Sequence, residues 1–212
     1  MSDRKSHWER VYATKRPDDV SWFRPHLDRS LAFLDRSALD MNSSIVDVGG
    51  GAATFVDDLV ERGFRRVTVL DISASALEAS KARLGTMAAE VTWVEADALE
   101  HVFSFESVDF WHDRAVFHFL RDEGERARYV GALTAALRPG GHVVLGTFAL
   151  EGPERCSGLQ VARYDAVSLL AELGNGFELI DSAEESHQTP WATTQAFVYV
   201  YARRRLCSVN PA

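Results

Sequence analysis

A run of glycines between a hydrophobic strand and a helix is the feature that most constrains this fold. Residues 45–48 read Ile-Val-Asp-Val, residues 49–51 are all glycine, and an apolar periodic run covers residues 55–62. The pattern predicts a buried parallel strand, a tight turn and the N-terminus of a helix. Glycine adopts positive φ without strain and lets a ligand approach the backbone, while the first N–H groups of the helix point at that ligand. A turn that binds nothing is the alternative, but it would rarely combine three glycines with an acid.

Strands and helices alternate after this turn, which indicates an α/β fold. Such alternation builds right-handed βαβ units around a parallel sheet, with ligands at the carboxyl ends of the strands. Further strands are expected at residues 67–71, 91–95, 108–111 and 142–148, and helices at 74–84 (capped by Ser73), 123–137 and 164–173. We expect residues 112–120 to turn away from the fourth strand, and residues 138–141 to form a sharp stop before the fifth.

The last two strands differ from the others. They are expected at residues 177–187 and 196–204, and the loop between them is too short for a parallel crossover, so they should pair antiparallel. The predicted fold class is therefore α/β, a three-layer sheet that is mostly parallel with an antiparallel C-terminal strand pair. The tail from residue 206 to 212 is expected to fray.

The segment that precedes the core carries an unusual number of aromatic residues. A helix over residues 2–15 would place Trp8, Val11 and Tyr12 on one face, and a helix is expected from Pro25 to about Leu39. Between them, residues 17–26 hold two aromatic and two basic side chains together with two prolines. A loop of this kind more often touches a ligand than merely spaces two helices, although a helix lying on the surface remains the alternative.

Composition argues against several classes of function. The chain has 212 residues, of which 46% are hydrophobic and 25% charged, and its net charge is −8. Binding nucleic acid through its phosphates needs a basic face, so we expect no such partner. Cys156 and Cys207 show neither metal-ligand spacing nor a disulfide framework, no apolar run is long enough to span a membrane, and the N-terminus is not signal-like. A cytoplasmic protein without metal or membrane partner is expected.

Asp71 narrows the ligand that the glycine turn could bind. It ends the second predicted strand, about twenty residues after the turn, where an acid can accept hydrogen bonds from both hydroxyls of a ribose. A dinucleotide dehydrogenase is one possibility, but Thr54 occupies the last position of a G-x-G-x-x-G pattern, and the C-terminal strand pair leaves no second nucleotide-binding half. Asp47 would also repel a pyrophosphate and attract a cation. S-adenosylmethionine, with its ribose, adenine and positive amino-acid group, fits better.

Several motifs in order make the chain resemble the class I (Rossmann-like) S-adenosylmethionine-dependent methyltransferases over residues 45–204. Residues 46–53 resemble the family's acid-x-Gly-x-Gly-x-Gly loop, with Ala53 in place of the usual last glycine, and residues 137–142 resemble the turn before strand five. The resemblance implies a Rossmann-like core at 44–204, an N-terminal helical lid within 1–40, and thus a single methyltransferase domain over 1–212.

The resemblance also implies S-adenosyl-L-methionine as the cofactor. In the family, an acid like Asp71 binds the ribose, an apolar residue like Ile72 packs on the adenine, and a residue like Asp97 receives the adenine amino group. The cofactor-binding residues implied in this way are Asp47, Gly49, Gly50, Gly51, Asp71, Ile72, Asp97, Ala98, His112, Trp8, Tyr12 and Trp22.

Methyl transfer is a displacement at carbon, so the protein mainly positions the acceptor and excludes water. An alcohol, thiol or ammonium acceptor must lose a proton. His112 is the first candidate for the base and His118 the second, because histidine titrates near neutrality. Asp113 could orient the substrate or only pair with Arg114, and for each of these residues a purely structural role is the alternative.

The remaining candidates concern binding of the substrate. Guanidinium groups recognise carboxylates, so Arg24, Arg114 and Arg163 could gather around an anionic substrate, with surface ion pairs as the alternative. Cys156 lies in the loop after the fifth strand, where it could contact a soft acceptor or be inert. Trp22 and His118 complete the predicted substrate-binding set.

Together these features predict methyl transfer to an oxygen or sulfur of a small-molecule acceptor, by a monomer or weak dimer. A protein lysine N-methyltransferase is the alternative, because small relatives with a similar N-terminal Trp-x-x-x-Tyr spacing can modify proteins. A cofactor-binding module without catalysis fits less well with the joint presence of Asp47, Asp71 and Asp97.

Overall fold

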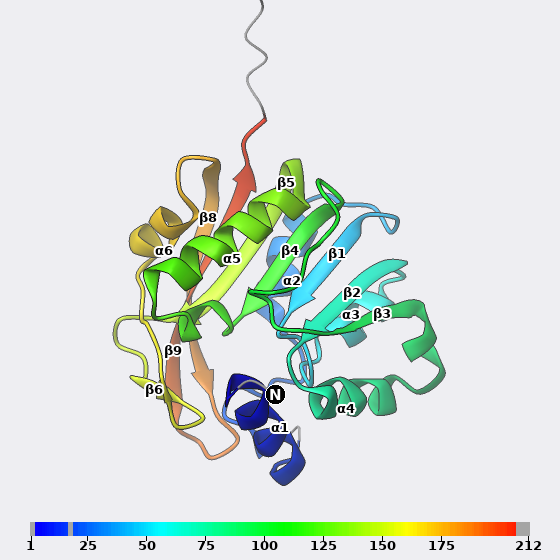
Figure 1. Ribbon diagram of the computed structural model, residues 1–212, viewed down its shortest axis with the longest axis vertical. Coiled ribbons are helices and arrows are strands. Elements are labelled where there is room, and N and C mark those ends of the chain that lie inside the picture. Colours follow the sequence, from blue (N-terminus) through cyan, green and yellow to red (C-terminus); the bar gives the residue numbers. More distant parts are fainter. Residues whose placement is uncertain (1–2, 17–18, 207–212) are drawn as a thin grey trace, which may run out of the picture.

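A twisted mixed sheet forms the centre of the molecule (Figure 1). The computed structural model describes residues 3–16 and 19–206, and within them a seven-stranded sheet has the order β3-β2-β1-β4-β5-β9-β8. Its strands are β1 (Ser44–Val48), β2 (Arg66–Asp71), β3 (Val91–Glu95), β4 (Val108–Arg114), β5 (Leu137–Phe148), β8 (Phe177–Gln188) and β9 (Thr194–Arg204). The strands from β1 to β5 pair in parallel, while β9 runs antiparallel to both β5 and β8. The predicted fold class is confirmed.

Helices cover both faces of this sheet. They are α1 (Asp3–Thr14), α2 (Asp28–Arg36), α3 (Phe55–Glu61), α4 (Ala74–Leu84), α5 (Glu123–Ala136) and α6 (Ala166–Leu173). Side chains of α2, α3 and α4 form one hydrophobic core with the sheet, and those of α5 and α6 form the other. Strand alternation supplies both cores, since Val67 and Val69 of β2 point to the first and Leu70 to the second.

Three elements differ from their predicted bounds by three residues or more. β4 continues through Arg114, because its last residues pair with β1 on one side and β5 on the other, and this pairing outweighs their polar character. The stretch 138–141, predicted as a stop, lies within β5 as an irregularity: Val108 pairs with Leu137, and the next pair is Phe110 with His142. α2 starts at Asp28, three residues after the expected Pro25, and His26 instead bonds Asp58 through its ring (Nδ1–Oδ1 2.8 Å).

The local signals around the glycine turn have the expected effect. Ser73 caps α4 with its side chain, which accepts a hydrogen bond from the Ala76 amide at 3.2 Å. Gly63 follows α3 with a φ of 84°, a conformation that glycine adopts without strain at the end of a helix.

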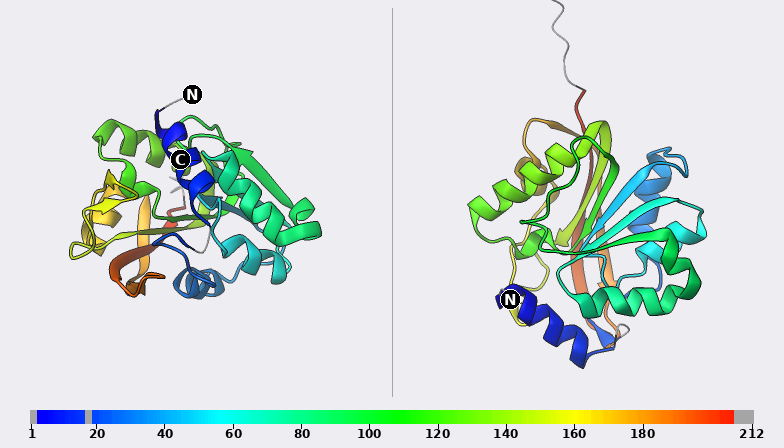
Figure 2. Two further views of the ribbon diagram at one scale, coloured as in Figure 1. Left: turned by 90° about the horizontal axis from the view of Figure 1, so that it is seen from below. Right: turned by 45° about the vertical axis from the view of Figure 1, so that its right-hand side comes forward.

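Helix α1 lies across the carboxyl ends of the parallel strands, beside α4 (Figures 1 and 2). The loop that follows it is described from Asp19 onward, so Pro17 and Asp18 of the predicted ligand-contacting loop lie outside the described residues. The same holds for Cys207 and for most of the tail expected to fray. In the part of the chain that the structure describes, no helix has the length and apolar character of a membrane span.

Candidate active site

The glycine turn makes room for acid side chains as well as for a ligand. Gly49 has a φ of 69°, in the left-handed region. A Cβ atom added to Gly50 would overlap the Asp47 carboxylate, and one added to Gly51 would overlap the Asp71 carboxylate, both closer than 3.0 Å. These glycines are therefore fixed by the two acids beneath them.

Three predicted acids border one cavity at the ends of β1, β2 and β3. Asp71 accepts hydrogen bonds from the amides of Gly51 (3.0 Å) and Ser73 (2.8 Å), and burial raises its pKa to about 7. Asp97 accepts one from the Leu99 amide at 2.9 Å. The cavity is also bordered by Gly49, Gly50, Ile72, Ala98 and His112. Gly51 does not border it and instead holds the Asp71 carboxylate.

Asp47 is held at the cavity by a buried hydrogen-bonded chain. Its Oδ1 lies 2.7 Å from His112 Nδ1, and His112 Nε2 lies 2.7 Å from the hydroxyl of Ser30 on α2. Asp47 and His112 are each 1% exposed. Among the described residues, none donates a hydrogen bond to Asp47 Oδ2. A buried carboxylate oxygen without a partner is costly, so this atom is suited to a cationic ligand in the cavity.

Asp113 and His118, two predicted catalytic residues, do not border the cavity. Asp113 accepts hydrogen bonds from the amides of Val116 (2.8 Å) and Phe117 (3.1 Å) and from the Tyr129 hydroxyl, so it shapes the turn after β4. Burial raises its pKa to about 6. The geometry therefore does not support a role for Asp113 in orienting the substrate.

His118 is sealed in the core. Its ring packs against Phe119 and Phe148, with centroid distances of 4.5 and 4.8 Å, and neither ring nitrogen has a partner among the described residues. Burial and the nearby Arg114 lower its pKa to about 3. His118 is thus neutral and out of reach of an acceptor in the cavity, and His112 has both nitrogens engaged, so the structure does not support either as the expected base.

The three predicted arginines lie in different surroundings. Arg24 and Arg114 border the cavity and Arg163 does not. Arg163 donates to the carbonyl of Gly152 at 3.1 Å and pairs with Glu154 at 3.2 Å, which is the surface ion pair considered as the alternative. The cavity is also bordered by Cys156, whose pKa is raised to about 12 by burial, so it is an un-ionised thiol.

Aromatic side chains cover the cavity from the side of α1. Trp8 lies 6.2 Å from Tyr12 and 6.0 Å from Trp22 between ring centroids, and 5.1 Å from Phe119. All four residues border the cavity. The sequence predicts Trp8, Tyr12 and Trp22 at this site. It does not predict Phe119, which directly follows His118.

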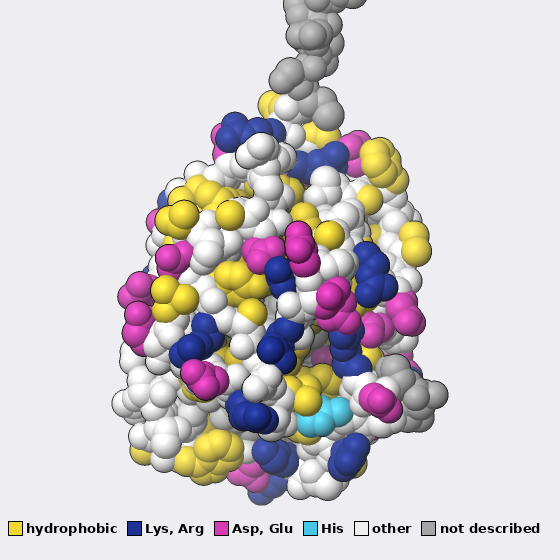
Figure 3. All heavy atoms as spheres, turned by 60° about the vertical axis from the view of Figure 1, so that its left-hand side comes forward, with side chains coloured by type: hydrophobic (Ala, Val, Ile, Leu, Met, Phe, Trp, Pro, Cys, Tyr) yellow, Lys and Arg dark blue, Asp and Glu magenta, His cyan; other side chains and the backbone are white. Residues whose placement is uncertain are grey.

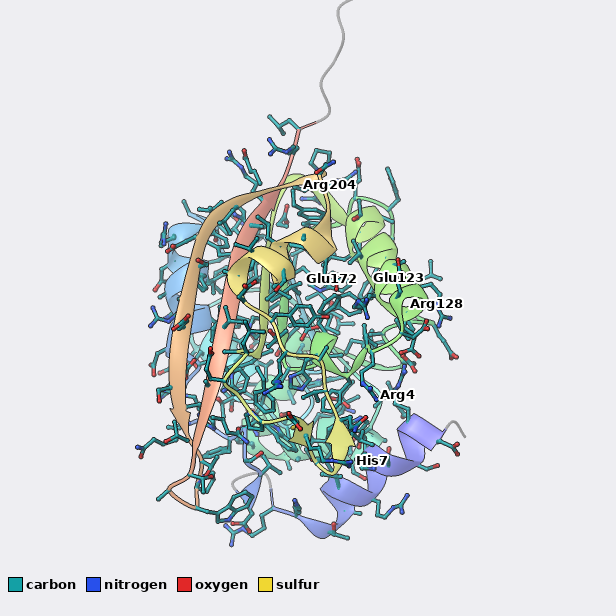
Figure 4. All side chains as sticks on the ribbon, turned by 90° about the vertical axis from the view of Figure 1, so that its left-hand side faces the viewer. Arg4, His7, Glu123, Arg128, Glu172 and Arg204 are labelled. Atoms are coloured by element: carbon teal, nitrogen blue, oxygen red, sulfur yellow. The ribbon has the colours of Figure 1, made fainter. Side chains whose placement is uncertain are left out.

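Polar contacts hold α1 against the body. Arg4 donates to Asp97 (3.2 Å) and to Glu125 (2.7 Å), and Figure 4 shows it on the side of α1 that faces the rest of the molecule. Glu9 accepts hydrogen bonds from the Ala74 amide and the Ser75 hydroxyl, both at 2.6 Å, at the start of α4. Sequence reasoning missed Arg4, Glu9 and Ser30. The position of Arg4, one turn before Trp8, is the one signal that could have found it.

Comparisons with known proteins agree with this site. A family model described as a methyltransferase domain matches residues 45–141. Nodulation protein S of Rhizobium tropici is 30% identical over 105 residues, which cover 50% of this chain and 43% of that protein. EEF1A lysine methyltransferase 2 of Danio rerio is 25% identical over 156 residues, 66% of each chain. The chain thus spans less than half of the first relative and about two thirds of the second.

A solved structure has the same fold. It is the 1,6-didemethyltoxoflavin-N1-methyltransferase of Burkholderia thailandensis with bound 1,6-didemethyltoxoflavin and S-adenosylhomocysteine, at a TM-score of 0.75. The two sequences are 20% identical, over 95% of this chain and 87% of that one. The glycine turn, the acids at three strand ends, the sheet order and the matched family model lead to one assignment. The chain contains a match to a methyltransferase domain at residues 45–141 and has the Rossmann-like methyltransferase fold.

Proposed function

We propose that this protein transfers a methyl group from S-adenosylmethionine to an oxygen or sulfur of a small-molecule acceptor. The observation that carries the proposal is the division of the cavity between two sets of side chains. Sheet order puts Asp47, Asp71 and Asp97 at the ends of β1, β2 and β3. Arg114, at the end of β4, and Cys156, after β5, border the cavity on the other side of β1. The first half suits the cofactor and the second an acceptor.

The residues of the first half fit S-adenosylmethionine by their chemistry. When bound, the cofactor would supply an electrophilic methyl group on a positively charged sulfur. Asp47 Oδ2 would accept a hydrogen bond from the ammonium group, Asp71 would bind the ribose hydroxyls, and Asp97 the adenine amino group. Gly49 and Gly50 would allow close approach, Ile72 and Ala98 would contact the adenine, and Trp8, Tyr12 and Trp22 would cover the site.

We propose oxygen or sulfur, and not the nitrogen of a lysine, as the acceptor atom because of the protonation states around the cavity. Among the described residues that border it, the carboxylates lie in the cofactor half, and His112 already uses both ring nitrogens. An acceptor must then ionise with little help from a base. A thiol, with an ordinary pKa of about 8.5, does so more readily than a lysine ammonium at about 10.4.

A protein lysine N-methyltransferase is the second candidate, and the similarity to EEF1A lysine methyltransferase 2 favours it. The aromatic cover over the cavity argues for the small acceptor, because a lysine on a protein surface needs an open channel to the methyl group. We propose no nucleic acid as a substrate. Acidic and basic side chains are interspersed on the face in Figure 3, and the net charge is −8, whereas binding to nucleic acid needs a basic face. We place the enzyme in the cytoplasm as a monomer or weak dimer.

The two candidates are separated by following the label from radioactive S-adenosylmethionine. The purified protein is incubated with a metabolite panel and, separately, with a cell lysate that is afterwards split into small molecules and protein. The proposal expects label in small molecules, and label confined to protein would favour the lysine enzyme. Calorimetry gives the control: if the wild type does not bind S-adenosylhomocysteine and Asp71→Ala changes nothing, the cofactor site itself is refuted.

A further inference from the structure

The guanidinium group of Arg114 is fixed in place at the edge of the cavity. Its Nε donates to the Tyr199 hydroxyl and its Nη1 to the carbonyl oxygen of Trp22, both at 2.9 Å. The guanidinium carbon lies 4.4 Å from the ring centroid of Phe197, as in a cation–π contact. These contacts come from β9 and from the loop after α1, so the side chain has little freedom. Arg114 borders the cavity, and among the described residues no hydrogen-bond partner is found for its Nη2.

Within the described part of the chain, the positive charge of Arg114 has no direct counter-ion. Nη2 is buried and has no hydrogen-bond partner within residues 3–16 and 19–206, and over the same residues no carboxylate lies within 4.0 Å of the guanidinium. The nearest acid in the hydrogen-bond network is Glu185, which contacts Arg114 only through the Tyr199 hydroxyl (2.7 Å) and is already paired with Arg24. A buried charge without a partner is costly, so an anion at Nη2 would be stabilising.

Apart from Glu185, which is paired with Arg24, the titratable groups packed near Arg114 are uncharged. Burial lowers the pKa of His118 to about 3 and also lowers that of His187, so both rings are neutral at pH 7. Cys156 and Tyr199, whose pKa values burial raises to about 12, keep their protons. Among these four groups none neutralises Arg114 and none is a strong base, so an acceptor beside Arg114 meets its fixed positive charge, whereas Arg24 is paired with Glu185.

We infer that Nη2 of Arg114 holds the methyl-accepting atom of the substrate itself as an anion, a thiolate or an ionised acidic hydroxyl. A carboxylate bound in the usual fork uses two guanidinium nitrogens, whereas Nε and Nη1 are engaged here, so a single anionic atom fits the free position better. Arg114 then replaces a general base, because it favours the ionised form of the acceptor before transfer. This inference rests on the proposed function and names the substrate class of its acceptor half.

The test uses two coloured probes, 4-nitrophenol and 4-nitrothiophenol, whose absorption reports ionisation directly. Each is titrated with pH in the presence of protein loaded with S-adenosylhomocysteine. Binding beside Arg114 should lower the apparent pKa of the bound probe by about 1–3, as expected for an acid next to a guanidinium. Arg114→Gln should abolish this lowering, and Arg114→Lys, which keeps the charge, should retain part of it.

Arg155→Gln is the matched control, since Arg155 is exposed in the same region. Among the residues that the structure describes, its side chain bonds only the carbonyl of Gly158 in its own turn (3.0 Å). It should leave the pKa of the bound probe as low as in the wild type. An unchanged probe pKa, no binding of either probe, or an equal lowering in Arg114→Gln overturns the inference. If Arg114→Gln does not fold, the wild type is compared with Arg114→Lys. This variant keeps the charge but changes the donor geometry, so a probe pKa identical to that of the wild type would contradict binding at Nη2. Binding of S-adenosylhomocysteine, measured alongside, shows separately whether the proposed function stands.

Discussion

Substitutions of His112 test how the protein positions Asp47, the carboxylate proposed to bind the ammonium group of the cofactor. The ring links Asp47 Oδ1 to the Ser30 hydroxyl through two contacts of 2.7 Å, and it packs on Phe55 with a centroid distance of 4.2 Å. We expect His112→Gln to keep a donor near Ser30 but to remove the one at Asp47. The matched variant His112→Asn should do the reverse, because the amide nitrogen of asparagine occupies nearly the position of Nδ1.

The two variants should differ in size of effect. His112→Gln leaves a buried carboxylate without a donor on either oxygen, and the free energy of unfolding should fall by about 2–4 kcal/mol. His112→Asn loses the contact to a neutral hydroxyl, which is worth about 1 kcal/mol. Chemical denaturation in urea, with equal slopes for all three proteins, measures both values.

The assay that isolates positioning compares two ligands by calorimetry. S-adenosylhomocysteine carries the ammonium group that Asp47 is proposed to bind, whereas 5′-methylthioadenosine keeps the adenine and ribose but lacks the amino-acid group. We expect His112→Gln to weaken the first ligand about tenfold, which is about 1.4 kcal/mol, and to leave the second within about twofold. Equal losses for both ligands, or none for either, would refute the reasoning, since a general loss of structure does not distinguish them.

Three further predictions concern the turn, its second acid and the lid. Gly51→Ala should lower the free energy of unfolding in urea by about 1–3 kcal/mol, because the new methyl group overlaps Asp71 and Ala76. Gly131→Ala, which has open space on α5, should raise it by about 0.5–1 kcal/mol. Equal effects of the two substitutions would contradict this account. Burial raises the Asp71 pKa from 3.8 to about 7, so the stability due to its proton is present below pH 3.8 and is lost as the pH rises through about 7. The stability of Asp71→Asn relative to the ligand-free wild type should therefore rise by about 1.4 kcal/mol per pH unit between about pH 4 and about pH 7, and a difference in urea unfolding that is flat with pH would count against it. Arg4→Gln breaks the ion pairs to Asp97 and Glu125. The rate of amide hydrogen exchange across α1 should rise about fivefold, which corresponds to a loss of about 1 kcal/mol in the stability of the docked helix. An unchanged exchange rate in mass spectrometry would show that Arg4 does not anchor α1.

The fold and the cofactor half of the site follow from local signals in the sequence. A hydrophobic strand, a glycine turn and a capped helix are each set by residues that are neighbours in the chain. Once the alternation of strands and helices gives a parallel sheet, its topology brings the strand ends together. That is why Asp47, Asp71 and Asp97 could be assigned to one cavity although they lie far apart in the sequence.

The acceptor half was harder to predict, because side-chain direction depends on where a strand ends. The sequence predicts that β4 ends at Trp111, and it therefore gives no direction for the side chains of residues 112–114. With the strand continued, His112 and Arg114 fall on the face of α2 and α3, while Asp113 points to the opposite face and bonds Tyr129 on α5. His118 is beyond the strand, and the aromatic packing that buries it comes from β5. That contact depends on tertiary packing and has no local signal.

The charge pattern of the cavity also bears on product release. Asp47 Oδ2 and Arg114 Nη2 are both buried and without partners among the described residues, and each suits a ligand of the opposite charge. Methyl transfer from a sulfonium to an anion leaves a thioether and an uncharged methylated product. The product would thus keep the shape of the acceptor but lose its attraction to Arg114, whereas the amino-acid group bound at Asp47 stays charged. On this reasoning the methylated acceptor leaves more readily than the spent cofactor, and the fixed arginine that favours the reactive anion also disfavours retention of the product.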